Sequence, residues 1–88
     1  LSNIELYVNI LSYRLFEDVV YKLIEIAAIY GDWIIRNFGG KWQEFDGIYG
    51  IREVGKRKDV VIPTDDIFNL WEKGKTVTYK AYNIKFSE

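Results

Sequence analysis

The 88-residue chain contains no cysteine and no histidine. Without cysteine it cannot form disulfides, thiolate metal sites or a cysteine nucleophile, and this composition fits a reducing compartment. Without histidine it lacks the side chain that most often acts as a general base or a metal ligand near neutral pH. The sequence also has no phosphate-binding glycine loop, nucleophile elbow or metal-binding motif. We therefore expect a non-enzymatic protein with no metal site and no cofactor.

Long apolar runs and a large excess of charge are also missing. The most apolar stretch, residues 19–35, is interrupted by Lys22, Glu25 and Asp32, which argues against a transmembrane helix. The 12 Lys and Arg residues balance the 13 Asp and Glu residues, whereas domains that bind nucleic acid through bulk charge are usually strongly basic. No secretory signal is visible, so we expect a cytoplasmic protein.

Aromatic residues, in contrast, are abundant. The chain has 3 Trp, 7 Tyr and 5 Phe residues and is 49% hydrophobic. A chain of this length forms one domain, so residues 1–88 are expected to share a single core. So many aromatic side chains exceed what such a core can hide, and some should reach the surface. Exposed aromatics favour a protein partner or a homodimer.

Glycines and the single proline divide the chain into a helical part, residues 1–40, and a part with a sheet and a short helix, residues 41–88. Apolar residues spaced three and four apart predict a long helix that Ser12 caps and that ends at Gly39-Gly40. Its apolar stripe comprises Leu15, Val19, Leu23, Ile26, Tyr30, Ile34 and Phe38. Residues 1–11 form either a separate short helix, capped by Ser2 or Asn3, or a continuation of the long one.

The long helix has a second apolar flank, made of Phe16, Val20, Ile24 and Ala28. A helix that is apolar on more than one side is covered on more than one side. The N-terminal segment or another protomer is expected to supply this cover.

The second half of the chain predicts an antiparallel meander. Asp46-Gly47 is a strong signal for a two-residue hairpin turn, which pairs Phe45 with Ile48 and places Trp42 opposite Ile51 on the other face. The next features are a third strand over residues 60–62 that Pro63 ends, a short helix capped by Thr64 and ended by Gly74, and a final strand over residues 76–86. The fold class is therefore α+β, with a long N-terminal helix packed on a small antiparallel sheet.

Gly31-Asp32 stands out inside the long helix, because glycine costs about 1 kcal/mol relative to alanine there. In the simpler interpretation another element packs closely against Gly31 while Asp32 is solvated. Alternatively, Asp32 belongs to a polar site beside Trp33.

Two charged groups are candidate sites. The turn Lys56-Arg57-Lys58, with Arg52 nearby and Trp42 and Tyr49 flanking it, can hold phosphates and stack on bases, although charged turns are usually just solvated. Asp65, Asp66 and Glu72 can hold a hard metal ion or run acid–base chemistry. The helix dipole already explains the two aspartates in the first turn of a helix.

The run from Tyr30 to Trp42, together with Pro63 and Gly74, resembles small bacterial domains of unknown function. In those domains a helix with a Gly-acid pair runs into Gly-Gly-x-Trp, and a short sheet and a proline precede a second helix. The resemblance covers roughly residues 24–77, with Asp32 where such domains more often carry Glu. Such domains occur near toxin and immunity systems, so the resemblance implies a protein-binding role.

Our leading hypothesis is a non-enzymatic protein-binding domain, either immunity-like or self-associating. The alternative is a binder of a small ligand or of single-stranded nucleic acid, which uses the basic hairpin and the aromatic sheet face. An enzyme that uses carboxylates with Tyr or Lys is a third possibility without motif support. The candidate partner-binding residues are Trp33, Trp42, Tyr49, Arg52, Lys56, Arg57, Lys58 and Trp71.

Overall fold

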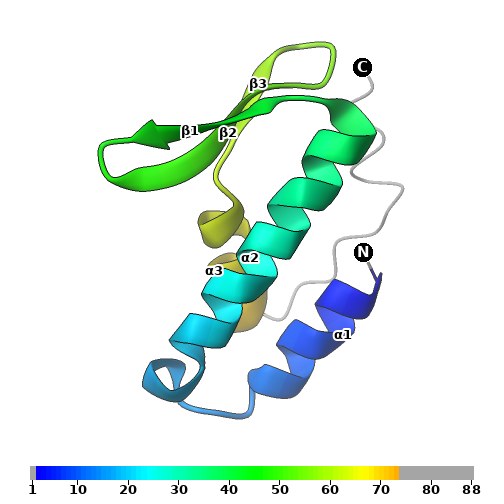
Figure 1. The fold of residues 1–88 in the computed structure, drawn as a ribbon. Coiled ribbons are helices and arrows are strands. Elements are labelled where there is room, and N and C mark those ends of the chain that lie inside the picture. The colour runs from blue at the N-terminus through cyan, green and yellow to red at the C-terminus, as the bar shows by residue number, and fades with distance from the viewer. Residues whose placement is uncertain (1, 74–88) are drawn as a thin grey trace.

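The computed structural model describes residues 2–73, with only the backbone of Ser2. Over this range the chain is an α+β fold, as predicted, in which helices pack beneath an antiparallel sheet of order β1-β2-β3 (Figure 1). The elements are α1 (Ser2–Leu11), α2 (Phe16–Phe38), β1 (Lys41–Phe45), β2 (Ile48–Val54), β3 (Asp59–Val61) and α3 (Pro63–Lys73). The predicted final strand over residues 76–86 and the helix-ending role of Gly74 lie outside the described residues.

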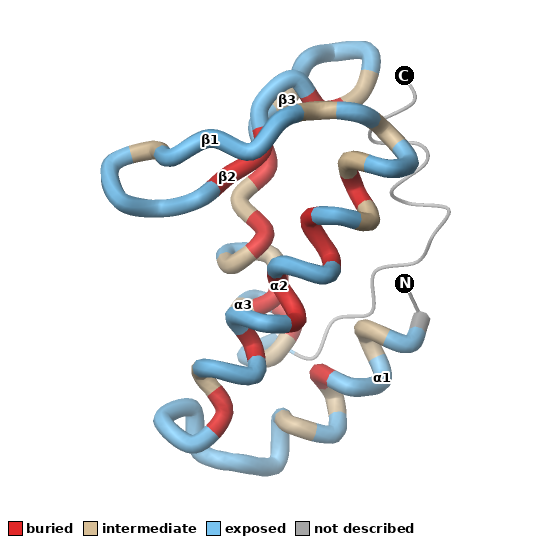
Figure 2. The backbone as a smooth tube through the Cα atoms, viewed as in Figure 1, coloured by how far each residue is buried: buried red, intermediate tan, exposed pale blue. Residues whose placement is uncertain are grey.

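The long helix α2 buries the predicted apolar stripe. Figure 2 shows its buried positions recurring along one side of the helix, while the other side is exposed. Of the seven stripe residues, the five in the middle are buried: Val19, Leu23, Ile26, Tyr30 and Ile34. The helix ends where predicted, because Gly39 adopts a positive φ of 82° and its N–H donates to the Ile35 carbonyl at 2.9 Å.

The prediction of the helix start was wrong in one respect. Residues 2–11 form the separate helix α1, but Ser12 does not cap α2. Its hydroxyl donates to the Asn9 carbonyl at 2.6 Å, which places Ser12 at the end of α1. The long helix begins at Phe16 after an extended Leu15, with no side-chain cap. Leu15, predicted to start the buried stripe, is therefore outside the helix and 66% exposed.

The start of α3 also differs from the prediction. Thr64 lies inside the helix, because the Asp66 N–H donates to the Ile62 carbonyl at 3.2 Å and Pro63 is the first helical residue. Proline suits this position, since its φ is already helical and it has no N–H to leave unpaired. The third strand ends accordingly at Val61, one residue earlier than expected.

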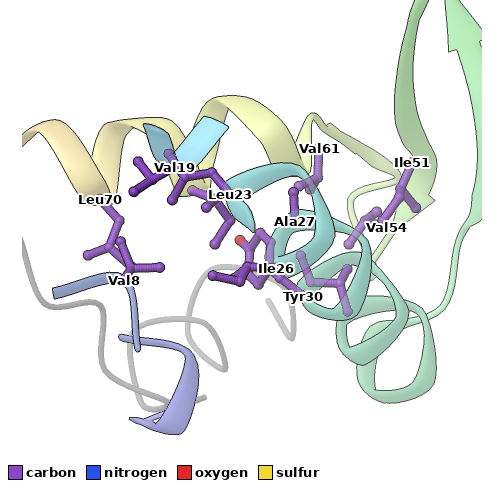
Figure 3. Packing of buried hydrophobic residues seen from close by; sticks show 12 residues of the cluster. Val8, Val19, Leu23, Ile26, Ala27, Tyr30, Ile51, Val54, Val61 and Leu70 are labelled. Carbon is purple, nitrogen blue, oxygen red and sulfur yellow. The ribbon is translucent and has the colours of Figure 1, made fainter. Parts of the chain in front are cut away.

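One apolar cluster joins all the layers. Val8 of α1 and Leu70 of α3 lie at one end of it, and Ile51 and Val54 of β2 lie at the other, with the α2 stripe between them (Figure 3). A hydrogen bond also joins α3 to α1: the indole of Trp71 donates to the Leu11 carbonyl at 3.0 Å. Across residues 2–73, no helix combines the length and apolar character needed to cross a lipid bilayer.

Candidate functional site

The β1–β2 hairpin forms as the sequence predicts. Asp46 and Gly47 both have positive φ, 51° and 86°, which is the geometry that a two-residue hairpin turn needs. Phe45 pairs with Ile48, and Trp42 pairs with Ile51. The hairpin projects beyond the helices at one end of the sheet, and the β2–β3 turn lies at the other end (Figure 1).

Trp42 anchors this hairpin to α2. A Cβ atom on Gly31 would lie 2.5 Å from Cζ2 of the Trp42 ring and closer still to Cη2, so the indole occupies the space that a side chain would fill. The Trp42 indole N–H donates to Oδ1 of Asp32 at 3.3 Å. The prediction of close packing against Gly31 is therefore correct, and Asp32, although exposed, accepts a hydrogen bond from the same tryptophan.

An apolar hollow opens between this hairpin, α2 and the first turns of α3. We call it the hairpin hollow; its volume is about 710 Å³, within the range of small-molecule sites. Its lining is apolar apart from Thr64, Asp65 and the polar edges of the tryptophan and tyrosine. The lining residues are Ile24, Ala27, Ala28, Trp42, Gly47, Ile48, Tyr49, Pro63, Thr64, Asp65 and Phe68.

Large apolar side chains remain exposed in this hollow. Tyr49 is 64% exposed, Ile48 51%, Ile24 46% and Trp42 40%. Single exposed apolar residues are ordinary on protein surfaces, but a group of them from three elements around one concavity marks a binding surface. The predicted second flank of α2 is thus only partly covered, because Ile24 and Ala28 face this hollow instead of α1.

The basic candidates lie elsewhere. Alternation along the hairpin places Arg52, which pairs with Lys41, on the sheet face opposite to Trp42 and Tyr49. The turn Lys56-Arg57-Lys58 follows the far end of β2, away from the hairpin tip (Figure 1). The aromatic and basic halves of the predicted nucleic-acid surface are therefore not brought together.

Two of the candidate tryptophans have packing roles. Trp33 makes an edge-on contact with Phe38, with ring centroids 5.5 Å apart, and both pack against the core. Trp71 lies edge-on to Phe16 at 5.3 Å, in addition to its hydrogen bond to Leu11. Of the eight candidate residues, the structure brings only Trp42 and Tyr49 to the hairpin hollow.

The three acidic candidates Asp65, Asp66 and Glu72 lie in different surroundings and do not form one site. Asp66 accepts a hydrogen bond from the buried Tyr30 hydroxyl at 2.6 Å, Asp65 lies at the edge of the hairpin hollow, and Glu72 is exposed near the end of α3. Within the described part of the chain, no three His, Cys, Asp or Glu side chains are grouped in a way that holds a metal ion.

Sequence reasoning missed Ile48 and Phe68 as site residues. Ile48 was expected only as a hairpin partner of Phe45, and Phe68 was not singled out. The signal that pointed to this surface was the second apolar flank of α2, which contributes Ile24 and Ala28.

Comparisons with protein-family models, with curated proteins and with solved structures found no match to this chain. The resemblance to bacterial domains with a Gly-acid and Gly-Gly-x-Trp motif therefore stays a prediction. What the structure adds is a physical reason for that pattern here, since Gly31 makes room for the Trp42 ring and Asp32 binds its indole.

Proposed function

We propose that this chain is a non-enzymatic protein-binding domain that receives apolar side chains of a partner in the hairpin hollow. The observation that carries the proposal is an open apolar concavity of about 710 Å³ around half-exposed Trp42, Ile48 and Tyr49. Tryptophan and tyrosine are the side chains that most often dominate binding energy at protein interfaces. The immunity-like role that the resemblance implies, and a cytoplasmic location, belong to the same proposal.

The energy available from this surface suits a partner that brings apolar groups of its own. Full burial of a large apolar side chain contributes about 1.5–3 kcal/mol. The exposed halves of Trp42, Ile48 and Tyr49 thus offer about 2–4 kcal/mol, before the entropy cost of association is subtracted. The partner must add buried surface of its own for stable binding.

The alternative is a binder of a small ligand or of single-stranded nucleic acid, and the geometry argues against its nucleic-acid form. Stacking on single-stranded nucleic acid needs aromatic faces beside a basic groove. Here the basic turn at residues 56–58 follows the opposite end of β2 from Tyr49, and Arg52 lies on the other sheet face from Trp42.

The test is affinity capture of partners with a matched pair of variants. Tyr49→Asp introduces a charge into the lining of the hollow, on the sheet face of Trp42, and Tyr13→Asp makes the same change at a 93% exposed tyrosine outside it. Proteins from the source cell that bind the wild-type chain should still bind Tyr13→Asp and should be lost with Tyr49→Asp. Circular dichroism checks that both variants are folded. An identical set of bound proteins for all three chains would contradict the proposal.

A further inference from the structure

We propose that the partner segment that enters the hairpin hollow is basic, with bulky apolar side chains flanked by lysine or arginine. This inference rests on the proposed function and names the chemistry of the occupant. It follows from the charges that surround the apolar lining.

One acidic side chain lines the hollow, and three others lie next to residues that line it. Asp65 is itself part of the lining, at the start of α3. Glu44 pairs across the hairpin with Tyr49, on the same sheet face as Trp42. Asp32 contacts the Trp42 indole from α2, and Asp46 precedes Gly47 at the hairpin tip. We call Asp32, Glu44, Asp46 and Asp65 the acidic rim; all four are exposed.

Within residues 2–73, the lining of the hollow supplies no positive charge to balance this rim. Among the described residues, no lysine or arginine lines it. Lys41 is adjacent to Trp42 in sequence, but it shares the opposite face of the hairpin with Arg52. An apolar centre with an acidic border attracts a segment of opposite charge, because the border speeds encounter and rejects acidic segments while the centre holds the apolar anchor.

The same charges argue against a second copy of this chain as the occupant. A two-fold symmetric dimer brings the same patch of both copies together, so each acid of the rim would approach its counterparts. Like charges across an interface are unfavourable. The acidic rim therefore favours a different protein over the homodimer that the aromatic content predicted.

The test measures binding of two synthetic amphipathic helical peptides to the full chain. Both carry leucines at helical spacing. All remaining positions are lysine in one peptide and glutamate in its twin. Neither contains tryptophan. Fluorine NMR of the chain labelled with fluorotryptophan reports on Trp33, Trp42 and Trp71 separately, once single Trp→Phe variants assign the signals.

We expect the lysine peptide to shift the Trp42 signal and to leave the other two tryptophan signals in place. It should bind about tenfold more tightly than the glutamate twin at low salt, and the difference should shrink as salt is added. The double variant Glu44→Lys, Asp65→Lys should reverse this preference. The matched control Glu17→Lys, Glu72→Lys makes the same charge change at exposed residues outside the hollow and should keep it.

Equal or tighter binding of the glutamate twin to the wild-type chain would overturn this inference and leave the proposed function standing. A Trp42 signal that responds to neither peptide would overturn it as well, whereas the proposed function is judged separately by the capture experiment with Tyr49→Asp. A Trp42 signal that changes with protein concentration, together with a dimer mass by light scattering, would replace the basic partner with a second copy. If the chain is a monomer and substitutions within residues 74–88 shift the Trp42 signal, that segment would replace the basic partner as the occupant.

Discussion

Substitution of Gly31 by alanine tests whether close packing of Trp42 on α2 sets the position of the hairpin. Alanine is the better helix former by about 1 kcal/mol, so at an open helix position this change would stabilise the protein. At Gly31 the new Cβ would lie 2.5 Å from Cζ2 of Trp42 and 3.2 Å from Cγ of Pro63. The indole must therefore move.

The loss of stability follows from the contacts that the Trp42 indole gives up when it moves. Trp42 is 40% exposed, so displacement uncovers more than half of a large side chain, which costs about 2 kcal/mol. Its exposed hydrogen bond to Asp32 adds about 0.5 kcal/mol. After the gain in helix propensity is subtracted, Gly31→Ala should destabilise the protein by about 1–2 kcal/mol.

A double-mutant cycle isolates this contact. In a Trp42→Ala background the ring is absent, and Gly31→Ala should change sign and stabilise the chain by up to about 1 kcal/mol, reduced by the remaining contact with Pro63. Urea unfolding followed by circular dichroism measures all four proteins without relying on tryptophan fluorescence. The reasoning fails if Gly31→Ala stabilises the protein while Trp42 is present, or if its effect is the same in both backgrounds.

Two further substitutions test the polar contacts that join the helices. Tyr30 is 1% exposed, and Tyr30→Phe removes its hydroxyl, which donates to Asp66 at 2.6 Å. Urea unfolding should show that the free energy of unfolding falls by about 1.5–3 kcal/mol. A change below about 0.5 kcal/mol would contradict this role. Trp71→Phe removes the donor to the Leu11 carbonyl but keeps an aromatic ring. The free energy of unfolding should fall by about 1 kcal/mol, and amide hydrogen exchange should accelerate most in α1. Equal acceleration in all helices would refute the role of this hydrogen bond in holding α1 to α3.

The elements that the sequence predicted well are those whose signal is local. The stripe of α2 was predictable because a helix buries residues at its own period, and Val19 to Ile34 keep that period without a break. The hairpin register followed from Asp46-Gly47, since turn geometry determines which residues face each other.

The predictions of the two N-caps were wrong because several polar residues near a helix start can act as the cap. Ser12 and Thr64 are both good caps by residue type, but Ser12 is bonded to the end of α1 and Pro63 starts α3 one residue before Thr64. Neither outcome is visible without knowing where the neighbouring helix ends or how the third strand leads into α3.

The candidate site was only partly predictable, because a hollow between elements depends on how far apart those elements sit. Ile48 of the hairpin and Phe68 of α3 both line it, and neither residue has a sequence feature that relates it to the other. The separation of Arg52 from Trp42, however, was already implied by the predicted register, since strand neighbours alternate between faces.

The contact between Gly31 and Trp42 has an evolutionary consequence. The glycine is tolerated in α2 because the indole needs its space, and the indole is held there because the helix offers no side chain. The two positions should therefore change together: in a related protein with a small residue in place of this tryptophan, the helix is free to replace its glycine with alanine. A sequence that keeps the tryptophan and loses the glycine should carry its hairpin at a different distance from the helix.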